Sequence, residues 1–210
     1  MRSLEPQRDH RAPVVWILAS GSPRRFELLR AAGQRCFEVV PSRADESRGA
    51  GEEAFRYVTR VARDKAREVA ARRPGVPVLG ADTIVVVDGE PLGKPCDPAD
   101  AAFMLDRLSN RAHEVVTAFV LLDASGTTIA DRVVRTEVVF RALGAEEIAD
   151  YVASGEPLDK AGAYAIQGGA ANFVVELSGS RSNVVGLPME EVEEALRRAG
   201  LWTAPVSPSR

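Results

Sequence analysis

The first candidate site is a short segment rich in serine and arginine. Residues 19–25 read ASGSPRR and stand between an apolar run and a helical pattern. Ser22 can cap that helix and Pro23 suits its first turn, and the N–H groups at a helix start attract anions. We therefore predict a phosphate site formed by Ser20, Ser22, Arg24 and Arg25. An ordinary capped helix with surface arginines would have the same local pattern.

The second candidate is a lysine on the apolar side of a long predicted helix, residues 52–73. On a helical wheel of about 100° per residue, Lys65 falls among Val58, Val61 and Val69, opposite the arginines of the helix. A lysine that points toward a core needs an anionic partner or a water-filled cleft. We therefore expect a functional role for Lys65. Snorkelling of its ammonium along the helix surface is the alternative.

The third candidate is a carboxylate inside the most apolar stretch of the chain. Residues 78–87 read VLGADTIVVV, a strand pattern interrupted by Asp82. A buried carboxylate is costly unless it is paired or binds a metal, which favours a catalytic or metal-binding role. An aspartate bonded to nearby backbone at a bulge is the alternative. The loop Asp45-Glu46-Ser47 offers further carboxylates, although it is also typical of a polar turn.

Two further segments carry polar groups without an obvious structural task. Gly93-Lys94-Pro95 follows a predicted hairpin after the Asp82 strand, so the chain could return Lys94 toward Asp82. Gln167 precedes two glycines, which allow a planar ligand to approach closely. Its amide both donates and accepts, which complements the O4 acceptor and N3–H donor of uracil or thymine. A solvated loop lysine and a structural turn are the respective alternatives.

Together these residues offer cations for phosphates, carboxylates for a divalent metal and an amide for a base. A metal that bridges phosphates offsets triphosphate charge, and a nearby carboxylate can take a proton from an attacking water. The sequence contains no Walker motif, no GxGxxG fingerprint and no Ser-His-Asp arrangement.

Alternating strand and helix patterns must position these groups, which indicates a mixed α/β protein. The expected strands are residues 14–19, 36–40, 78–87, 114–122, 128–140 and 173–177, and the expected helices are 24–32, 52–73, 98–108, 145–154 and 189–199. We expect a flexible extension over 1–12, one domain over 13–202 and a flexible tail over 203–210.

Composition restricts the class of partner. The 210 residues carry a net charge of −3, so no broad positive field favours nucleic acid. Two cysteines and two histidines without metal-ligand spacing argue against zinc and against a disulfide. The apolar run over 14–19 is too short for a signal peptide core or a membrane span. We expect a cytoplasmic protein.

The same residues resemble the Maf family of nucleotide pyrophosphatases. The similar segments are LASGSPRR (18–25), DES (45–47), VARDKA (61–66), LGADTIV (79–85), GKP (93–95), PLDKAGAYAIQG (157–168) and VVGLPM (184–189). They occur in the family's order and span most of the chain. The resemblance implies an elongated α/β fold, a mixed sheet with flanking helices and two lobes around a deep cleft, similar to inosine-triphosphate pyrophosphatases.

The resemblance also implies hydrolysis of a nucleoside triphosphate to the monophosphate and pyrophosphate with Mg²⁺ or Mn²⁺. It implies Asp82 as proton acceptor, Glu46 and Asp82 at the metal, and Lys65 and Lys94 at the reacting phosphates. Subgroups differ at the positions of Arg24, Thr83 and Gln167, and this combination is similar to the dTTP/UTP-directed subgroup. Modified pyrimidine nucleotides are a further expected substrate, and a homodimer is implied.

Two other functions compete with this interpretation. One is a purine-directed house-cleaning pyrophosphatase on the same scaffold. The other is a nucleotide-binding regulator of cell division and septation, with which the family name is linked. The complete set of carboxylates and lysines argues against a protein that only binds.

Overall fold

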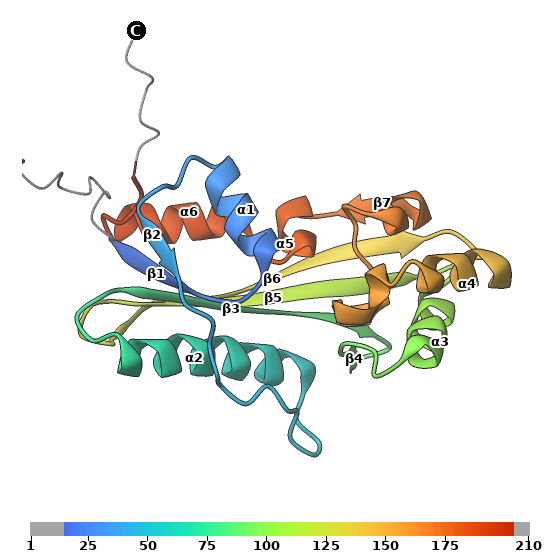
Figure 1. The fold of residues 1–210 in the computed structure, drawn as a ribbon, viewed down its shortest axis with the longest axis horizontal. Coiled ribbons are helices and arrows are strands. Elements are labelled where there is room, and N and C mark those ends of the chain that lie inside the picture. The colour runs from blue at the N-terminus through green and yellow to red at the C-terminus, as the bar shows by residue number, and fades with distance from the viewer. Residues whose placement is uncertain (1–14, 204–210) are drawn as a thin grey trace, which may run out of the picture.

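The computed structural model describes residues 15–203, and within this range seven strands form one mixed sheet (Figure 1). The strands are β1 (Trp16–Ala19), β2 (Phe37–Val39), β3 (Val78–Val87), β4 (Glu90–Leu92), β5 (Ala112–Leu122), β6 (Thr128–Phe140) and β7 (Val174–Ser178). Their order is β2-β1-β3-β5-β6-β7, with β4 paired to β3. β1 is parallel to β2 and β3, and the other pairs are antiparallel.

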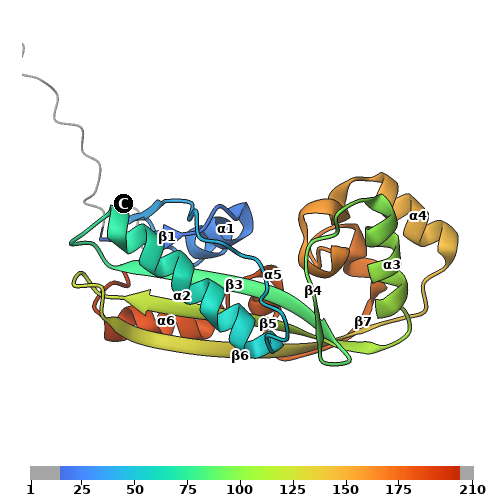
Figure 2. The same cartoon turned by 90° about the horizontal axis from the view of Figure 1, so that it is seen from below.

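The helices cover the two faces of this sheet. They are α1 (Pro23–Ala31), α2 (Ala54–Arg72), α3 (Pro98–Leu108), α4 (Ala145–Ala153), α5 (Arg181–Val185) and α6 (Met189–Arg198). α2 lies along one face, while α1, α5 and α6 lie on the other (Figure 1). Three short 3-10 segments, 156–159, 161–163 and 169–173, complete the far end of the sheet beside α3 and α4 (Figure 2).

Side chains of β3 alternate between these two faces, as the two-residue period of a strand requires. Val78, Ile84 and Val86 pack with α2, whereas Leu79 and Ala81 pack with the core beneath α6. Gly80 lies against α2 so closely that an added Cβ would be 2.5 Å from the carbonyl oxygen of Ala62. Neighbouring β3 residues therefore reach opposite faces of the sheet.

One edge of β3 is paired only in part. β1 pairs with β3 as far as Gly80, and β4 begins to pair with it at Val85. No described strand pairs with the intervening residues, 81–84, on that side. On this side β3 is therefore unpaired over residues 81–84, a gap in the sheet that we call the opening. Asp82 and Thr83 lie in this opening.

The far end of the sheet has its own aromatic core. His113 on β5 is 3% exposed, and its Nε2 lies 2.8 Å from the hydroxyl of Tyr164. The ring of Phe140 meets both of these rings edge-on. Burial, and secondarily the charge of Arg111, lowers the pKa of His113 to about 4. The imidazole is therefore neutral at physiological pH.

The predicted elements agree with the structure within about two residues at their ends. The strand expected over 114–122 begins two residues earlier in the structure, at Ala112. β4 is the second strand of the hairpin expected after the Asp82 strand, although its bounds were not predicted. α5 and the 3-10 segments were not predicted, because they are too short to show periodicity. The expected extension, 1–12, and residues 204–210 of the expected tail lie outside the described residues. No described helix has the length and apolar character needed to cross a membrane.

Candidate active site

A cavity of about 390 Å³ opens beside the unpaired edge of β3, between the helices at the two ends of the sheet. This volume lies in the range of small-molecule sites. The structure brings to its wall the residues for which the sequence analysis expected a role in the site: Ser20, Ser22, Arg24, Arg25, Glu46, Lys65, Asp82, Thr83, Lys94 and Gln167. Their positions span much of the chain, so the fold and not sequence proximity brings them together.

The most buried charge cluster of the cavity is centred on Lys65. Its Nζ lies 2.8 Å from Asp82 Oδ1 and 2.8 Å from Glu46 Oε2. The side chains of Lys65 and Asp82 are 8% and 11% exposed, whereas Glu46 is half exposed. Lys65 therefore points inward to anionic partners and does not snorkel, and Asp82 is paired with a side chain and not with backbone at a bulge.

The loop that carries Glu46 is fastened to α2. The hydroxyl of Tyr57 donates to the backbone carbonyl of Glu46 at 2.8 Å, and Arg60 donates to that of Ser47 at 2.9 Å. Burial raises the pKa of Tyr57, and the charges of Asp82 and Glu46 add to this shift. Asp45 turns away from the cavity and accepts the Ser47 amide at 2.9 Å. Only one acidic residue of this loop therefore faces the cavity.

Arg25 occupies the other face of β3. Its guanidinium donates to Gly186 O at 2.7 Å, to Ser20 Oγ at 3.1 Å and to Thr83 Oγ1 at 3.0 Å. Burial lowers the pKa of Arg25, and Asp82 opposes that shift, yet a guanidinium remains charged near neutral pH. Three of its five N–H groups are used by these bonds, so the remaining two are available to an anion in the cavity.

Thr83 and the start of α1 differ in detail from what the sequence suggests. The Thr83 hydroxyl accepts from Arg25 and lies 2.9 Å from the Thr117 hydroxyl, which itself donates to Asn183 O at 3.1 Å. The single proton of the Thr83 hydroxyl has two acceptors within reach, the Thr117 hydroxyl at 2.9 Å and Gly186 O at 3.3 Å. Ser22 occupies the N-cap position of α1, but its hydroxyl makes no capping bond. That hydroxyl is free to meet a ligand.

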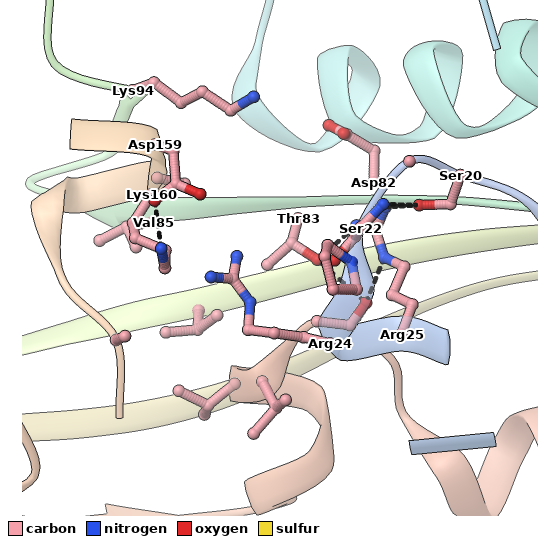
Figure 3. A pocket seen from close by; sticks show the side chains of 18 of the residues that line it. Ser20, Ser22, Arg24, Arg25, Asp82, Thr83, Val85, Lys94, Asp159 and Lys160 are labelled. Atoms are coloured by element: carbon pink, nitrogen blue, oxygen red, sulfur yellow. Dashed lines mark hydrogen bonds and ion pairs between the residues drawn. The ribbon is translucent and has the colours of Figure 1, made fainter. Parts of the chain in front are cut away.

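Cations reach the cavity from both ends of the sheet. Figure 3 shows Lys94 extending toward Asp82, and Arg24 extending the opposite way toward Asp159 and Lys160. The Lys160 ammonium forms an ion pair with Asp159, and the side chain of Lys160 is 14% exposed. Sequence reasoning assigned no role to Asp159 or Lys160. Each is an ordinary charged residue in a loop pattern, and only the folded chain shows that both line the cavity.

Gln167 lies at the rim of the cavity and is exposed. It stands in a tight turn, because the amide of Gly168 donates to the carbonyl of Ala165 at 3.0 Å. The side chain is therefore presented from a short, constrained segment of the cavity that the start of α1 also lines.

Comparison with known proteins gives a consistent result. The family model described as "Maf-like protein" matches residues 15–199. A dTTP/UTP pyrophosphatase of Geotalea uraniireducens is 54% identical over 184 residues, which cover 88% of this chain and 94% of that protein. A dTTP/UTP pyrophosphatase of Salmonella typhimurium is 54% identical over 180 residues, covering 85% and 90%.

One solved structure is also similar. It is a nucleoside-triphosphatase, a dITP/XTP pyrophosphatase, from Mycobacterium abscessus, and it is 20% identical in sequence. The match covers 59% of this chain and 71% of that chain, with a TM-score of 0.39.

Proposed function

The chain belongs to the Maf family, and from this premise we propose that it hydrolyses dTTP and UTP to the monophosphate and pyrophosphate. One observation carries the proposal: an ammonium bridges two carboxylates in a cavity that other cations line. Lys65 lies 2.8 Å from both Glu46 and Asp82. Such a site supplies charge for phosphates and a base for water within one small volume. Modified pyrimidine triphosphates belong to the same proposed substrate class.

The cations would bind the triphosphate tail. Arg24, Lys65 and Lys94 line the cavity, and Arg25 retains two N–H groups. Fixed positive groups of this kind stabilise the charge that develops on a leaving pyrophosphate, because they need no reorganisation during the reaction. Ser20 and Ser22 add neutral donors at the start of α1.

Glu46 and Asp82 would hold a divalent metal, Mg²⁺ or Mn²⁺. The donor set fits such an ion, since two carboxylate oxygens already converge on one cation, Lys65 Nζ. Residues 15–203 contain no group of three or more His, Cys, Asp or Glu that could hold a metal. Mg²⁺ is usually bound by one or two carboxylates together with substrate phosphates. When bound, the ion would supply Lewis-acid neutralisation of phosphate oxygens.

Asp82 would act as the proton acceptor. Its Oδ1 is held by Lys65 at 2.8 Å, which fixes the carboxylate at the opening in the sheet. A water attacks the α phosphorus and gives its proton to Asp82. The bond between the α phosphorus and the oxygen that bridges it to the β phosphorus breaks, and pyrophosphate leaves with that oxygen. Lys65 orients the carboxylate of Asp82, the catalytic base, and faces the same substrate phosphates.

Gln167 would read the base, with Thr83 acting on specificity through Arg25. The Gln167 amide can donate to O4 and accept from N3–H of uracil or thymine. Thr83 already accepts from Arg25 and contacts the Thr117 hydroxyl, so its hydroxyl positions that arginine. We take residues 13–202 as one catalytic unit, with the two helix-covered ends of the sheet as lobes around a deep cleft.

A substrate panel tests the proposal. We expect pyrophosphate release with Mg²⁺ or Mn²⁺ to be fast for dTTP, UTP and their modified forms, and slow for CTP, GTP and ATP. Cytosine and adenine lack the keto and N–H edge that Gln167 complements, and guanine carries that edge farther from the ribose. Release of pyrophosphate, and not of phosphate, identifies the α–β cut.

Two outcomes would contradict the proposal in different ways. If pyrophosphate were released quickly from purine nucleotides alone, the role of Asp82 would stand, but the enzyme would recognise purines and not pyrimidines. No release from any nucleotide, together with measurable nucleotide binding, would favour a binding regulator.

A further inference from the structure

The turn that carries Gln167 is held at both ends by one pair of side chains. The amide of Ala165 donates to the hydroxyl of Tyr151 at 3.1 Å, and the amide of Gly169 donates to Glu156 Oε2 at 3.2 Å. The same Tyr151 hydroxyl donates to Glu156 Oε1 at 2.8 Å. We call this pair, Tyr151 and Glu156, the brace.

The brace is itself fixed by packing. Tyr151 lies on α4, is 7% exposed, and meets the ring of Phe173 edge-on at 5.2 Å. Burial raises the pKa of Tyr151, so the phenol keeps the proton that it donates to Glu156. Glu156 begins the 3-10 segment 156–159, three residues after the end of α4, and its bond to the Gly169 amide is exposed to solvent. The Ala165 end of the turn therefore rests on a buried ring, and the Gly169 end on a partly exposed carboxylate.

The glycines of the turn leave room for the brace. A Cβ at Gly168 would lie 2.1 Å from Glu156 Oε1, and one at Gly169 would lie 3.0 Å from the Tyr151 ring. Gly168 has a negative φ of −115°, which any residue can adopt. A side chain at this position would therefore displace the flexible end of Glu156 from the turn.

We propose that Tyr151 and Glu156 are positioning residues that set the distance of Gln167 from the phosphate site, and so select pyrimidine over guanine nucleotides. The inference rests on the proposed base-reading role of Gln167. Uracil and guanine both present a carbonyl oxygen beside a ring N–H, so an amide bonds either edge equally well. The guanine edge lies farther from the ribose because of the fused ring.

Rigid placement is therefore what separates the two bases. An amide held at one distance from the triphosphate site reaches the uracil edge at hydrogen-bond length, and the larger base does not fit between them. An amide on a loose turn can move back and accept guanine. Selectivity thus depends on groups that never touch the base.

The test uses Tyr151→Phe, which removes one hydroxyl and keeps the buried ring. The hydroxyl makes two hydrogen bonds, with the Ala165 amide and with Glu156. We expect the ratio of kcat/KM for UTP to that for GTP to fall at least about tenfold, the factor that corresponds to the loss of one hydrogen bond. Glu156→Ala should lower the ratio as well, and Glu156→Gln should restore part of it, because its amide can still bridge Gly169 and Tyr151. Ser109→Ala is the matched control, since it removes a comparable bond from the Leu143 amide, 2.9 Å long, outside the cavity lining.

A double-mutant cycle shows whether the brace acts through Gln167. Gln167→Ala alone should lower the ratio, and Tyr151→Phe/Gln167→Ala should lower it no further, because coupled residues are not additive. Hydrogen exchange gives a readout independent of activity: the Ala165 amide should exchange about tenfold faster in Tyr151→Phe.

The inference and the proposed function fail differently. A wild-type enzyme that hydrolyses UTP and GTP equally well overturns base reading by Gln167, and the inference with it. A selective wild type whose ratio is unchanged by Tyr151→Phe, or falls additively in the double variant, overturns the inference alone. An unchanged Ala165 exchange rate would also overturn it.

Discussion

Within residues 15–203, Asp82 is paired with one cation, Lys65, which it shares with the carboxylate of Glu46. This makes the role of Asp82 testable by substitution. In Asp82→Asn, Lys65 keeps its ion pair with Glu46 at 2.8 Å, so the buried ammonium is not left uncompensated. We expect a normal fold and a loss of kcat of at least about 100-fold, because the amide cannot take the water proton. Pyrophosphate release and thermal unfolding measure the two quantities.

Lys65→Met tests whether Lys65 binds the substrate phosphates in addition to orienting the carboxylate of Asp82. The thioether side chain fits the space of a lysine stem without its charge, and the triphosphate loses a cation, so KM for UTP should rise. Near-normal kcat in Asp82→Asn would contradict its role as base. Unchanged affinity in Lys65→Met would restrict Lys65 to holding the two carboxylates.

Single residues were predictable where they broke a strong pattern. Lys65 interrupts an apolar helix face and Asp82 an apolar strand, and each break indicated a buried charge before any contact was known. Glu156 and Lys160 break no pattern, because charged residues are ordinary in loops. Their contacts depend on how a 3-10 segment returns toward β3, which periodicity does not encode.

The packing of α2 on β3 depends on one glycine. An added Cβ at Gly80 would lie 2.5 Å from Ala62 O, 2.7 Å from Ala66 N and 2.8 Å from Ala66 Cβ, and helix backbone cannot move as a flexible side chain can. We expect Gly80→Ala to lower the free energy of unfolding by about 1–3 kcal/mol, the usual cost of overpacking. Urea denaturation measures this change.

Gly49→Ala is the matched control for that substitution. A Cβ at Gly49 would meet only ordinary contacts of 3.7 Å with the Glu52 side chain. Its effect should stay within about 0.5 kcal/mol, as for most surface changes. Equal stability of Gly80→Ala and wild type would show that α2 can move away from β3 at little cost, and would contradict the close packing.

Two long elements were predicted to the residue, whereas the short ones were predicted only in part. The ten residues of β3 and the eleven of α3 begin and end where the sequence pattern placed them. The short strands β1, β2 and β7 were expected from their apolar residues, and β4 only as the second strand of a hairpin. α5 has five residues, too few turns for its helical period to be recognised. These short elements matter to the site, because β4 ends the opening in the sheet and α5 leads to the carbonyl that binds Arg25.

The stability of the whole molecule should depend on pH through His113. The folded-state pKa of about 4 lies below the ordinary unfolded value of about 6.5. Stability is therefore fully present above about pH 6.5 and is lost as pH falls toward 4, since the unfolded chain binds a proton that the folded chain excludes. The loss should reach about 3 kcal/mol, at about 1.4 kcal/mol for each pKa unit.

Urea unfolding of wild type and His113→Gln at pH 7 and pH 5 isolates this effect. Glutamine can still bond the Tyr164 hydroxyl but does not titrate, so its stability should change less between the two pH values. Contributions of carboxylates are present in both proteins and cancel in the difference. The same pH dependence in both would contradict the assignment.

At the scale of the molecule, the α/β class followed from alternating patterns, whereas the mixed strand order did not. Antiparallel pairing of β3 with β5 depends on contacts between residues far apart in the chain, such as Val78 with Leu122, whereas β5 and β6 are joined by a short turn. The cavity between the two ends of the sheet follows from that order. Residue patterns alone indicated the chemistry of the cavity, but not which elements line it.

An unpaired length of strand is a place where another extended chain can add by main-chain hydrogen bonds and start aggregation. The open part of β3 lies between two paired lengths and beneath helices at both ends, and Asp82 within it is 7% exposed. A passing peptide would have to bury its backbone beside an aspartate and several cations. The polar groups of this opening therefore also protect the protein from associating with itself, so variants that neutralise them should be watched for solubility as well as turnover.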